Sequence, residues 1–518
     1  MKIIKTGLLL ASAATIAVAG VAQAQTPEAA ETPADTATPP SAEDMAAQQA
    51  FLQAQVEALQ AQVEALKKQV TAAAPSWKGA PQWSDPDSGW SFKPKGWVQF
   101  DAGYVSTPGP DRQGTVGGLN YNNLGFNARS RRIIIGAEGT MPGGFGYKVE
   151  LDFAQAQVSY EDVLLTWQKK GSPFQITVGN FYPLSSLETM TSSRNTSFLE
   201  RAAFTDAFGY NRRIGLAFAY LSPSDKFSVS AGFWGTEIND NNYSGSVSVV
   251  VPTVPGTGTG TVTSSPSPNW NRTGWQASAR AVISPTFGDT RLHLGVNAQY
   301  RKANRDAQNV RYRSRPFTQV TDQRFVDTGA IAADGDTIVG VELAAIHGPI
   351  HFAGEAQKVW VRGAAPGTTY GLNNAAGGTF YNDDPSFWSA YGELGFYLTG
   401  ETRGYKGGRW DRTKVLKPID QGGIGAIQVN GRIDYTDLSD RVSSGAVAAP
   451  NYINGGRQTG YELSLIWNPM DFVRIMAQYA HLHVKGGPRQ IAVDPLTTDI
   501  AGDSYNLDTL GMRAQIEF

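Results

Sequence analysis

The sequence predicts an all-β fold, a 16-stranded antiparallel transmembrane β-barrel preceded by a short N-terminal α-helical coiled coil. Three observations predict this fold class. First, apolar and polar residues alternate with a period of two from residue 96 to the end of the sequence. Second, the segments between these runs are alternately short and long, as the turns and loops of outer-membrane barrels are. Third, the 518 residues include 57 glycines, 23 phenylalanines and 20 tyrosines but no cysteine, which suits strands with one apolar and one wetted face.

The first 24 residues predict secretion. Lys2 and Lys5 form a basic start, the run from Gly7 to Gly20 is apolar and uncharged, and Ala22-Gln23-Ala24 has the small-x-small pattern that a signal peptidase reads. We therefore expect a signal peptide over residues 1–24. The alternative is an N-terminal membrane anchor, but the apolar run is shorter than the roughly 20 residues that cross a bilayer.

The next two segments predict a disordered linker followed by a helix. Residues 25–42 are rich in Pro, Ala, Thr and Glu and lack aromatic residues, so they cannot bury a core. Within residues 43–72, apolar residues recur at alternating spacings of four and three, which is a heptad pattern with Val at a and Leu at d. Its members are Leu52, Val56, Leu59, Val63, Leu66 and Val70. A helix this short needs partner copies of itself, so we expect a coiled coil; an amphipathic helix packed on the barrel is the alternative.

Residues 73–95 are expected to form a turn-rich linker, and residues 96–518 the barrel. In the run 145–154, Tyr147 and Val149 share one face while Lys148 and Glu150 share the other. Sixteen such runs can be placed: 97–105, 131–140, 145–154, 159–168, 173–181, 212–221, 225–235, 272–284, 289–301, 336–346, 349–360, 387–399, 423–436, 456–468, 471–485 and 505–518. Two connections break the alternation of short turns and long loops: the loop at 155–158 is short, and the turn at 400–422 is long.

We find no sign of catalytic or metal chemistry in the motifs. The five histidines form no H-E-x-x-H motif, and the sequence contains no G-x-S-x-G, no phosphate-binding glycine loop and no cysteine nucleophile. His481 and His483 share a strand face and are more simply explained as solvated side chains than as metal ligands. We therefore expect no enzyme, no cofactor and no metal site, and no nucleic-acid partner.

Arginine is the more informative residue type. Several arginines lie in the phase opposite the apolar face, and a charge on the lipid face would cost about 2–4 kcal/mol at the membrane midplane, so we expect them in the lumen. They are Arg132, Arg213, Arg280, Arg291, Arg301, Arg432, Arg474 and Arg513. Guanidinium groups favour phosphate and carboxylate and rings of them make anion-selective pores. The alternative is that they pair with lumen acids, for which the candidates are Glu138, Glu150, Asp152, Glu355 and Glu393.

Two long loops add polar groups to this picture. The third, residues 182–211, carries two arginines beside hydroxyl groups: Ser192, Ser193, Arg194, Thr196 and Arg201. The fifth carries a basic patch of Arg301, Lys302, Arg305, Arg311, Arg313 and Arg315. Such a patch raises the local concentration of anions, or alternatively faces acidic lipopolysaccharide.

The barrel segment resembles the phosphate-selective porin O and P family. The resemblance is carried by SRRIIIGAEGTMPGGFGYKVELDF at 130–153, ITVGNFYPLSSLETMTSSRNTSFLERA at 176–202, YLTGETRGYKGGRW at 397–410 and GYELSLIWNPMDFVRIMAQYAHL at 460–482. It implies a homotrimer of 16-stranded barrels, each with its own pore, in which arginines and the third loop lead an anion to a narrow zone and a long turn folds inward. The N-terminal heptads depart from the family's founding pattern.

The resemblance also implies candidate anion contacts lining the pore. Matched by motif position are Arg131, Arg132, Ser192, Ser193, Arg194 and Arg201. Arg280, Arg291 and Arg301 are matched by strand order only, and Arg403 and Arg409 lie in the long turn that is expected to fold inward.

Together these features predict a passive outer-membrane porin of a Gram-negative bacterium, with its coiled coil in the periplasm. We expect it to prefer anions, such as phosphate or small organic anions. The alternatives are a general or sugar-directed porin with weak charge selectivity, and a barrel that acts mainly as an envelope tether. The expected partners are two further copies of the chain, outer-membrane lipid and lipopolysaccharide, and small polar or anionic solutes; peptidoglycan is an alternative partner for the coiled coil.

Overall fold

The computed structural model describes residues 41–73, 75–85, 87–107, 115–116, 119–120, 124–154, 158–238, 247–251, 260–264, 274–303, 309–329, 331–364, 384–441, 453–487 and 504–518. The expected signal peptide and nearly all of the linker at 25–42 lie outside these residues. The chain divides into two compact units, Met1–Ala72 and Ala73–Phe518.

The described part of the first unit is one α-helix, α2 (Ala42–Ala73), which confirms the helix expected over residues 43–72. Leu52, Val56, Leu59 and Val63 of the heptad pattern are between 49% and 60% exposed, so they form an apolar stripe open to solvent. The side chains of Leu66 and Val70 are outside the described set. No helix among the described residues is long and apolar enough to cross a bilayer.

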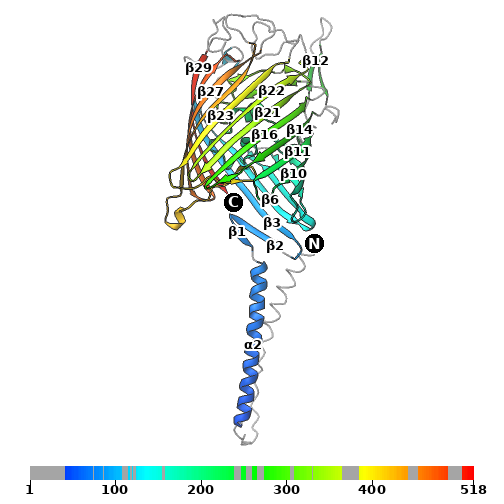
Figure 1. Cartoon of the computed structure of the whole chain (residues 1–518), viewed down its shortest axis with the longest axis vertical. Coiled ribbons are helices and arrows are strands. Elements are labelled where there is room, and N and C mark those ends of the chain that lie inside the picture. Colours follow the sequence, from blue (N-terminus) through cyan, green and yellow to red (C-terminus); the bar gives the residue numbers. More distant parts are fainter. Residues whose placement is uncertain are drawn as a thin grey trace. The chain divides into compact units, whose positions relative to one another are not determined.

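The second unit is a closed antiparallel barrel, and it confirms the fold class predicted for residues 96–518 (Figure 1). Its sixteen strands follow one another around the wall: β3 (Trp90–Val105), β6 (Gly125–Met141), β7 (Phe145–Asp152), β8 (Ser159–Trp167), β9 (Phe174–Phe181), β10 (Arg213–Leu221), β11 (Phe227–Trp234), β14 (Trp275–Ile283), β16 (Thr290–Lys302), β21 (Gly335–His347), β22 (Ile350–Arg362), β23 (Ser386–Tyr397), β26 (Ala426–Asp440), β27 (Ile453–Met470), β28 (Val473–Lys485) and β29 (Ser504–Glu517).

The barrel closes between its first and last strands. β29 pairs antiparallel with β3 from Glu517 opposite Trp97 to Thr509 opposite Val105. Below this ladder the amide of Gly96 donates to the carbonyl of Phe518 at 3.1 Å, and the amide of Phe518 donates back at 2.9 Å. A Cβ at position 96 would lie 2.5 Å from the Phe518 ring, so only glycine allows this close approach.

The alternation of the strands separates an apolar outside from a polar inside. On β29, Leu510 and Met512 point outward and are 54% and 58% exposed, whereas Arg513 and Gln515 point inward and are buried. In an empty barrel, side chains that point inward would be exposed to water. Because these are buried, loops must fill much of the lumen.

The start of the second unit differs from the turn-rich linker expected over residues 73–95. It contains β1 (Ser76–Lys78) and β2 (Ala80–Asp85), which pair with each other. β2 also pairs with the start of β3, where Trp83 lies opposite Phe92 and their ring centroids are 6.0 Å apart. Aromatic cross-strand pairs favour a sheet, so β3 begins at Trp90 rather than near residue 96.

Short helices and strands lie within the loops and turns of the barrel. The third loop, residues 182–212, contains α3 (Leu187–Met190) and α4 (Ala203–Ala207). Two-stranded ribbons and one further short strand account for the other strands: β4 (Thr115–Val116) with β5 (Leu119–Asn120), β12 (Val247–Val251) with β13 (Gly260–Ser264), β17 (Asn309–Val310) with β20 (Ile331–Ala332), β18 (Arg313–Ser314) with β19 (Val326–Asp327), β24 (Tyr405–Lys406) with β25 (Arg409–Trp410), and β15 (Thr286–Phe287) beside β16. The 3₁₀-helices η1 (Pro142–Gly144) and η5 (Ile419–Gln421) lie in turns.

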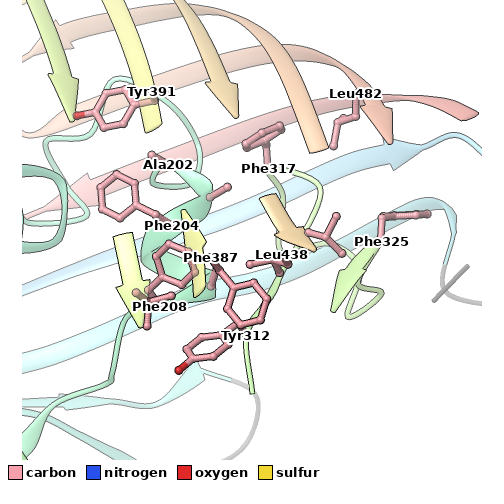
Figure 2. Packing of buried hydrophobic residues seen from close by; sticks show 14 of the residues in the cluster. Ala202, Phe204, Phe208, Tyr312, Phe317, Phe325, Phe387, Tyr391, Leu438 and Leu482 are labelled. Atoms are coloured by element: carbon pink, nitrogen blue, oxygen red, sulfur yellow. The ribbon is translucent and has the colours of Figure 1, made fainter. Parts of the chain in front are cut away.

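An apolar cluster inside the barrel joins the third and fifth loops to the wall. Figure 2 shows Phe204 and Phe208 of the third loop beside Tyr312 of the fifth loop and Phe387 of β23. The rings of Phe208 and Tyr312 meet edge to face with their centroids 5.8 Å apart, and those of Phe204 and Tyr391 stack at 5.9 Å. Burial of these aromatic rings stabilises both loops within the lumen.

Candidate functional site

One side of the lumen remains open. A cavity of about 1050 Å³ runs between the third loop and the inward faces of β3, β6, β7, β8 and β9. The fifth loop, through residues 314–319, and the long turn between β23 and β26, through residues 409–411, complete its lining. We call this cavity the passage.

The third loop is held against the opposite wall by carboxylate and amide side chains. The Glu355 carboxylate of β22 accepts the amide hydrogens of Leu187 at 2.9 Å and Glu188 at 2.8 Å. Asp434 of β26 accepts the amide of Ala203 at 2.8 Å, and Gln478 of β28 accepts that of Leu199 at 2.7 Å. These bonds fix the loop to β22, β26 and β28, and the passage is what remains beside β3–β9.

Arg432 is the electrostatic centre of this contact. Its fully buried guanidinium lies 2.9 Å from Glu188 of the third loop, 2.8 Å from Glu393 and 3.7 Å from Glu462. Buried charges persist only when they are paired, so each of these carboxylates depends on the same arginine. This lumen arginine is therefore a structural ion-pair centre.

The long turn meets the third loop from the other end. The amide of Trp410 donates to Thr191 Oγ1 at 3.2 Å, and Arg403 donates to the carbonyl of Asn195. The resemblance implied that this turn folds inward, and these contacts agree with it.

The passage is rich in both signs of charge. Among the described residues that line it, nine are basic: Lys95, Arg131, Arg132, Lys148, Arg194, Arg201, Arg212, Arg315 and Arg409. Nine are acidic: Glu138, Glu150, Asp152, Glu161, Asp162, Glu200, Asp206, Glu237 and Asp411. The totals cancel, so any preference for one sign depends on where each charge lies and on what it is paired with.

Six of the nine basic side chains are in ion pairs. The pairs are Lys95 with Glu138 and Glu150, Arg131 with Glu200, Lys148 with Glu150 and Asp162, Arg194 with Glu517, Arg212 with Glu161 and Asp162, and Arg315 with Asp206.

The other three, Arg132, Arg201 and Arg409, have no carboxylate within 4.0 Å among the residues that the structure describes. Arg132 donates to Gln99 Oε1 at 2.9 Å. Arg201 donates to the carbonyls of Glu188 and Thr191 at 2.8 and 2.6 Å. The positive charges of Arg132 and Arg201 are therefore hydrogen-bonded but not neutralised.

The pKa of Tyr182 indicates the sign of the electrostatic potential beside these arginines. The guanidinium of Arg212 lies 4.2 Å from its centroid, and that of Arg201 lies 5.9 Å away. Burial raises the pKa of Tyr182, but the positive charges of Arg212, Arg201 and Arg132 outweigh burial and lower the pKa below its ordinary value. In the long turn, burial and repulsion by Arg280 lower the pKa of Arg409. The lowered pKa of Tyr182 reflects an excess of positive charge, whereas that of Arg409 reflects mainly its burial.

Seven of the eleven candidate contacts expected from the sequence line the passage: Arg131, Arg132, Ser192, Ser193, Arg194, Arg201 and Arg409. The other four lie elsewhere. Arg280 is paired with Glu342 at 2.6 Å, Arg291 with Asp225 at 3.1 Å and Arg301 with Asp336 at 2.5 Å, while Arg403 is packed on Trp410.

Sequence reasoning missed several lining residues. Lys148 lies in the polar phase of its strand, so alternation alone could have identified it. Arg212 and Tyr182 lie at the two ends of the third loop, where no strand phase applies, and only the folded loop brings their side chains together. In the fifth loop, Arg311 and Arg315 are paired with Asp327 and Asp206, so these two members of the basic patch are neutralised.

Comparisons with known proteins identify the family. The model of the family described as phosphate-selective porin O and P matches residues 111–518. An uncharacterized protein from Caulobacter vibrioides is 34% identical over 456 residues, covering 86% of this chain and 77% of the relative. The outer-membrane channel DcaP of Acinetobacter baumannii is 14% identical, with 84% of this chain and 99% of that one covered and a TM-score of 0.42. An anion-selective porin from Comamonas acidovorans is 11% identical, with 83% and 100% covered and a TM-score of 0.42. The chain thus belongs to the phosphate-selective porin O and P family and is an outer-membrane channel, not an enzyme.

Proposed function

We propose that this porin lets small anions pass in preference to cations, with phosphate and small organic anions as the permeant class. The observation that carries the proposal is the set of three lining arginines, Arg132, Arg201 and Arg409, that lack a carboxylate partner in the described structure. Unpaired guanidinium groups attract anions and repel cations inside a narrow polar pore.

The acidic side chains of the passage are more fully compensated. Seven of the nine lie in ion pairs, namely the six acids in the pairs described above and Glu237, which is 3.6 Å from Arg213. Asp152 is in none, but its Oδ1 accepts the amide hydrogens of Ile133 and Ala154 at 3.0 and 2.9 Å, which offset its charge locally. Asp411 acts electrostatically on Arg409. Arg132 and Arg201 therefore carry the positive excess of the passage. Ser192, Ser193 and the paired Arg131 and Arg194 are further polar contacts in its lining.

The test is the reversal potential of the purified channel in planar bilayers under a KCl gradient, followed by titration of phosphate block of the chloride current. We expect a potential of the sign that marks anion preference and a block by phosphate. The double substitution Arg132→Gln with Arg201→Gln should move the potential toward zero and weaken the block.

The double substitution Lys169→Gln with Lys170→Gln is the matched control, because it removes two positive charges from an exposed turn outside the passage and should change neither quantity. A wild-type potential near zero or of the cationic sign would contradict the proposal. It would favour a general or sugar-directed porin, in which aromatic side chains rather than arginines guide the solute.

We further propose that the channel is a homotrimer and that α2 joins its three chains as a coiled coil in the periplasm, after removal of a signal peptide over residues 1–24. The exposed stripe of Leu52, Val56, Leu59 and Val63 supports this, since such a heptad stripe is buried in a coiled coil. Deleting residues 43–72 should lower the yield of trimers measured by chemical cross-linking. Intact trimers with a weakened cell envelope would favour a tether to peptidoglycan instead.

A further inference from the structure

Glu200 of the third loop occupies the centre of an arginine cluster in the passage. Its carboxylate accepts two hydrogen bonds from Arg131 of β6, at 2.7 and 3.0 Å, and a third from Arg513 of β29 at 3.0 Å. The Glu200 side chain is 15% exposed, as is that of Arg131, so both reach the passage. A bidentate bond of this kind is also the geometry in which a guanidinium binds phosphate.

The cluster holds more positive than negative charge. Arg131, Arg132 and Arg513 all act electrostatically on Glu200, and Arg513 is shared with Asp101, at 2.7 Å. Three guanidinium groups thus face two carboxylates. Removing Glu200 would leave three cations beside one anion, at a point that solutes in the passage reach.

The arginines around Glu200 favour the ionised form of its carboxyl group. Burial raises the pKa of its carboxyl group, but Arg131, Arg513 and Arg132 outweigh burial and hold the pKa well below its usual range. Like a permeant anion, Glu200 brings an ionised carboxylate into the lumen. Unlike a permeant anion, it is covalently attached to the third loop and cannot leave.

We infer that Glu200 is a tethered counter-anion: it fills the position that a phosphate group would take between Arg131 and Arg513, and so keeps anion binding in the passage weak. This inference rests on the proposed function, because it names what limits affinity in the same passage. Weak binding is useful in a channel, since a solute that is bound too tightly cannot leave. Glu200 would thereby determine whether the pore conducts anions or is blocked by them.

The experiment measures phosphate block of the chloride current through the full-length channel, wild type against Glu200→Gln. Arg131 would lose its carboxylate partner, while Arg513 would keep Asp101 at 2.7 Å. The half-blocking phosphate concentration should therefore fall by about tenfold or more. The matched control is Glu237→Gln, which removes the same charge from the same passage, where Glu237 lies 3.6 Å from Arg213. Glu237→Gln should shift the reversal potential toward anions without a comparable fall in the half-blocking concentration.

Two results would overturn the inference. One is a Glu200→Gln channel with unchanged or weaker phosphate block and a larger, noisier conductance, because Glu200 would then be only a strut for the loop. The other is an equal gain in Glu237→Gln, because the effect would then be one of net charge. If Glu200→Gln does not assemble, Glu200→Asp keeps the charge but shortens its reach. It should lower the half-blocking concentration by about twofold to threefold, and no change would again contradict the inference.

The two proposals fail separately. A wild-type channel without anion preference contradicts the proposed function, yet the Glu200→Gln channel could still gain phosphate block, which would show a site that Glu200 fills in the wild type. If the wild type prefers anions but the Glu200→Gln variant shows no stronger phosphate block, the proposed function stands and this inference is contradicted.

Discussion

The two sides of the lumen use the same residue types for opposite purposes. On the docked side, formed by β22, β23, β26, β27 and β28, arginine and glutamate are buried together and bind the third loop, as Arg432 does with Glu188 and Glu393. On the open side, formed by β3 and β6–β9, charged side chains line the passage, and Arg132 is left without an acid. The comparison shows that a lumen arginine becomes a candidate for solute contact only where no loop packs over it.

The largest effect is expected from breaking the docked side. Arg432→Gln leaves Glu188, Glu393 and Glu462 buried without their common cation, and loss of one partner of a buried ion pair costs about 3–5 kcal/mol. The free energy of unfolding, measured in urea with the protein in lipid vesicles, should fall by that amount. A loss below about 1 kcal/mol would show that water or another cation compensates for the arginine.

A second way to loosen the docked side is through its apolar cluster. Phe204 is 1% exposed, and Phe204→Ala should lower the free energy of unfolding by about 3 kcal/mol because it leaves a cavity among packed rings. Current noise in single-channel recordings should rise as the third loop gains freedom. Phe287, which is 66% exposed in a turn, offers a control, since Phe287→Ala should leave the noise unchanged.

On the open side, a paired arginine should affect selectivity more than stability. Arg315 lies 3.3 Å from Asp206, and both side chains are partly exposed, so Arg315→Gln should cost about 1 kcal/mol or less. Because Asp206 stays behind in the passage, the reversal potential should shift toward cations. A shift toward anions would mean that Asp206 does not reach the solute.

The smallest effect is expected from a substitution that lies on neither the docked side nor the open side of the lumen. Arg291 is in the lumen phase of its strand but pairs with the half-exposed Asp225 and does not line the passage. Arg291→Gln should change the free energy of unfolding by about 0–1 kcal/mol and leave the reversal potential where it was. A clear loss of anion preference in bilayer recordings would place Arg291 on the route of the solute.

The sequence predicted the barrel well because a strand is a local pattern. Each of the sixteen expected runs overlaps one of the sixteen strands, since alternation of apolar and polar residues can be read within ten positions. The largest differences are at the starts of β3 and β6, which begin at Trp90 and Gly125 and not at residues 97 and 131. The early start of β3 depends on its pairing with β2, in which Trp83 and Phe92 meet across a hairpin.

The candidate site was only partly predictable. The position of a residue in a strand predicts which face of the sheet its side chain lies on, but not which residues on other strands it contacts. Arg132 and Arg280 share the inward phase, yet Arg280 is neutralised by Glu342 two strands away. Gly295 lies between them on β16, and a Cβ there would come within 2.7 Å of the Glu342 carboxylate. The missing side chain lets the two charges meet, and nothing near Arg280 in the sequence signals it.

The closing seam of the barrel also has a consequence for the order of assembly. Arg513 of β29 holds Asp101 of β3 across the seam, and the same guanidinium binds the Leu199 carbonyl at 2.6 Å and the Glu200 carboxylate. The third loop is made early in synthesis, but its bonds to Arg513 need a strand made more than 300 residues later. Closure of the wall between β29 and β3 therefore also completes the attachment of the loop that shapes the pore.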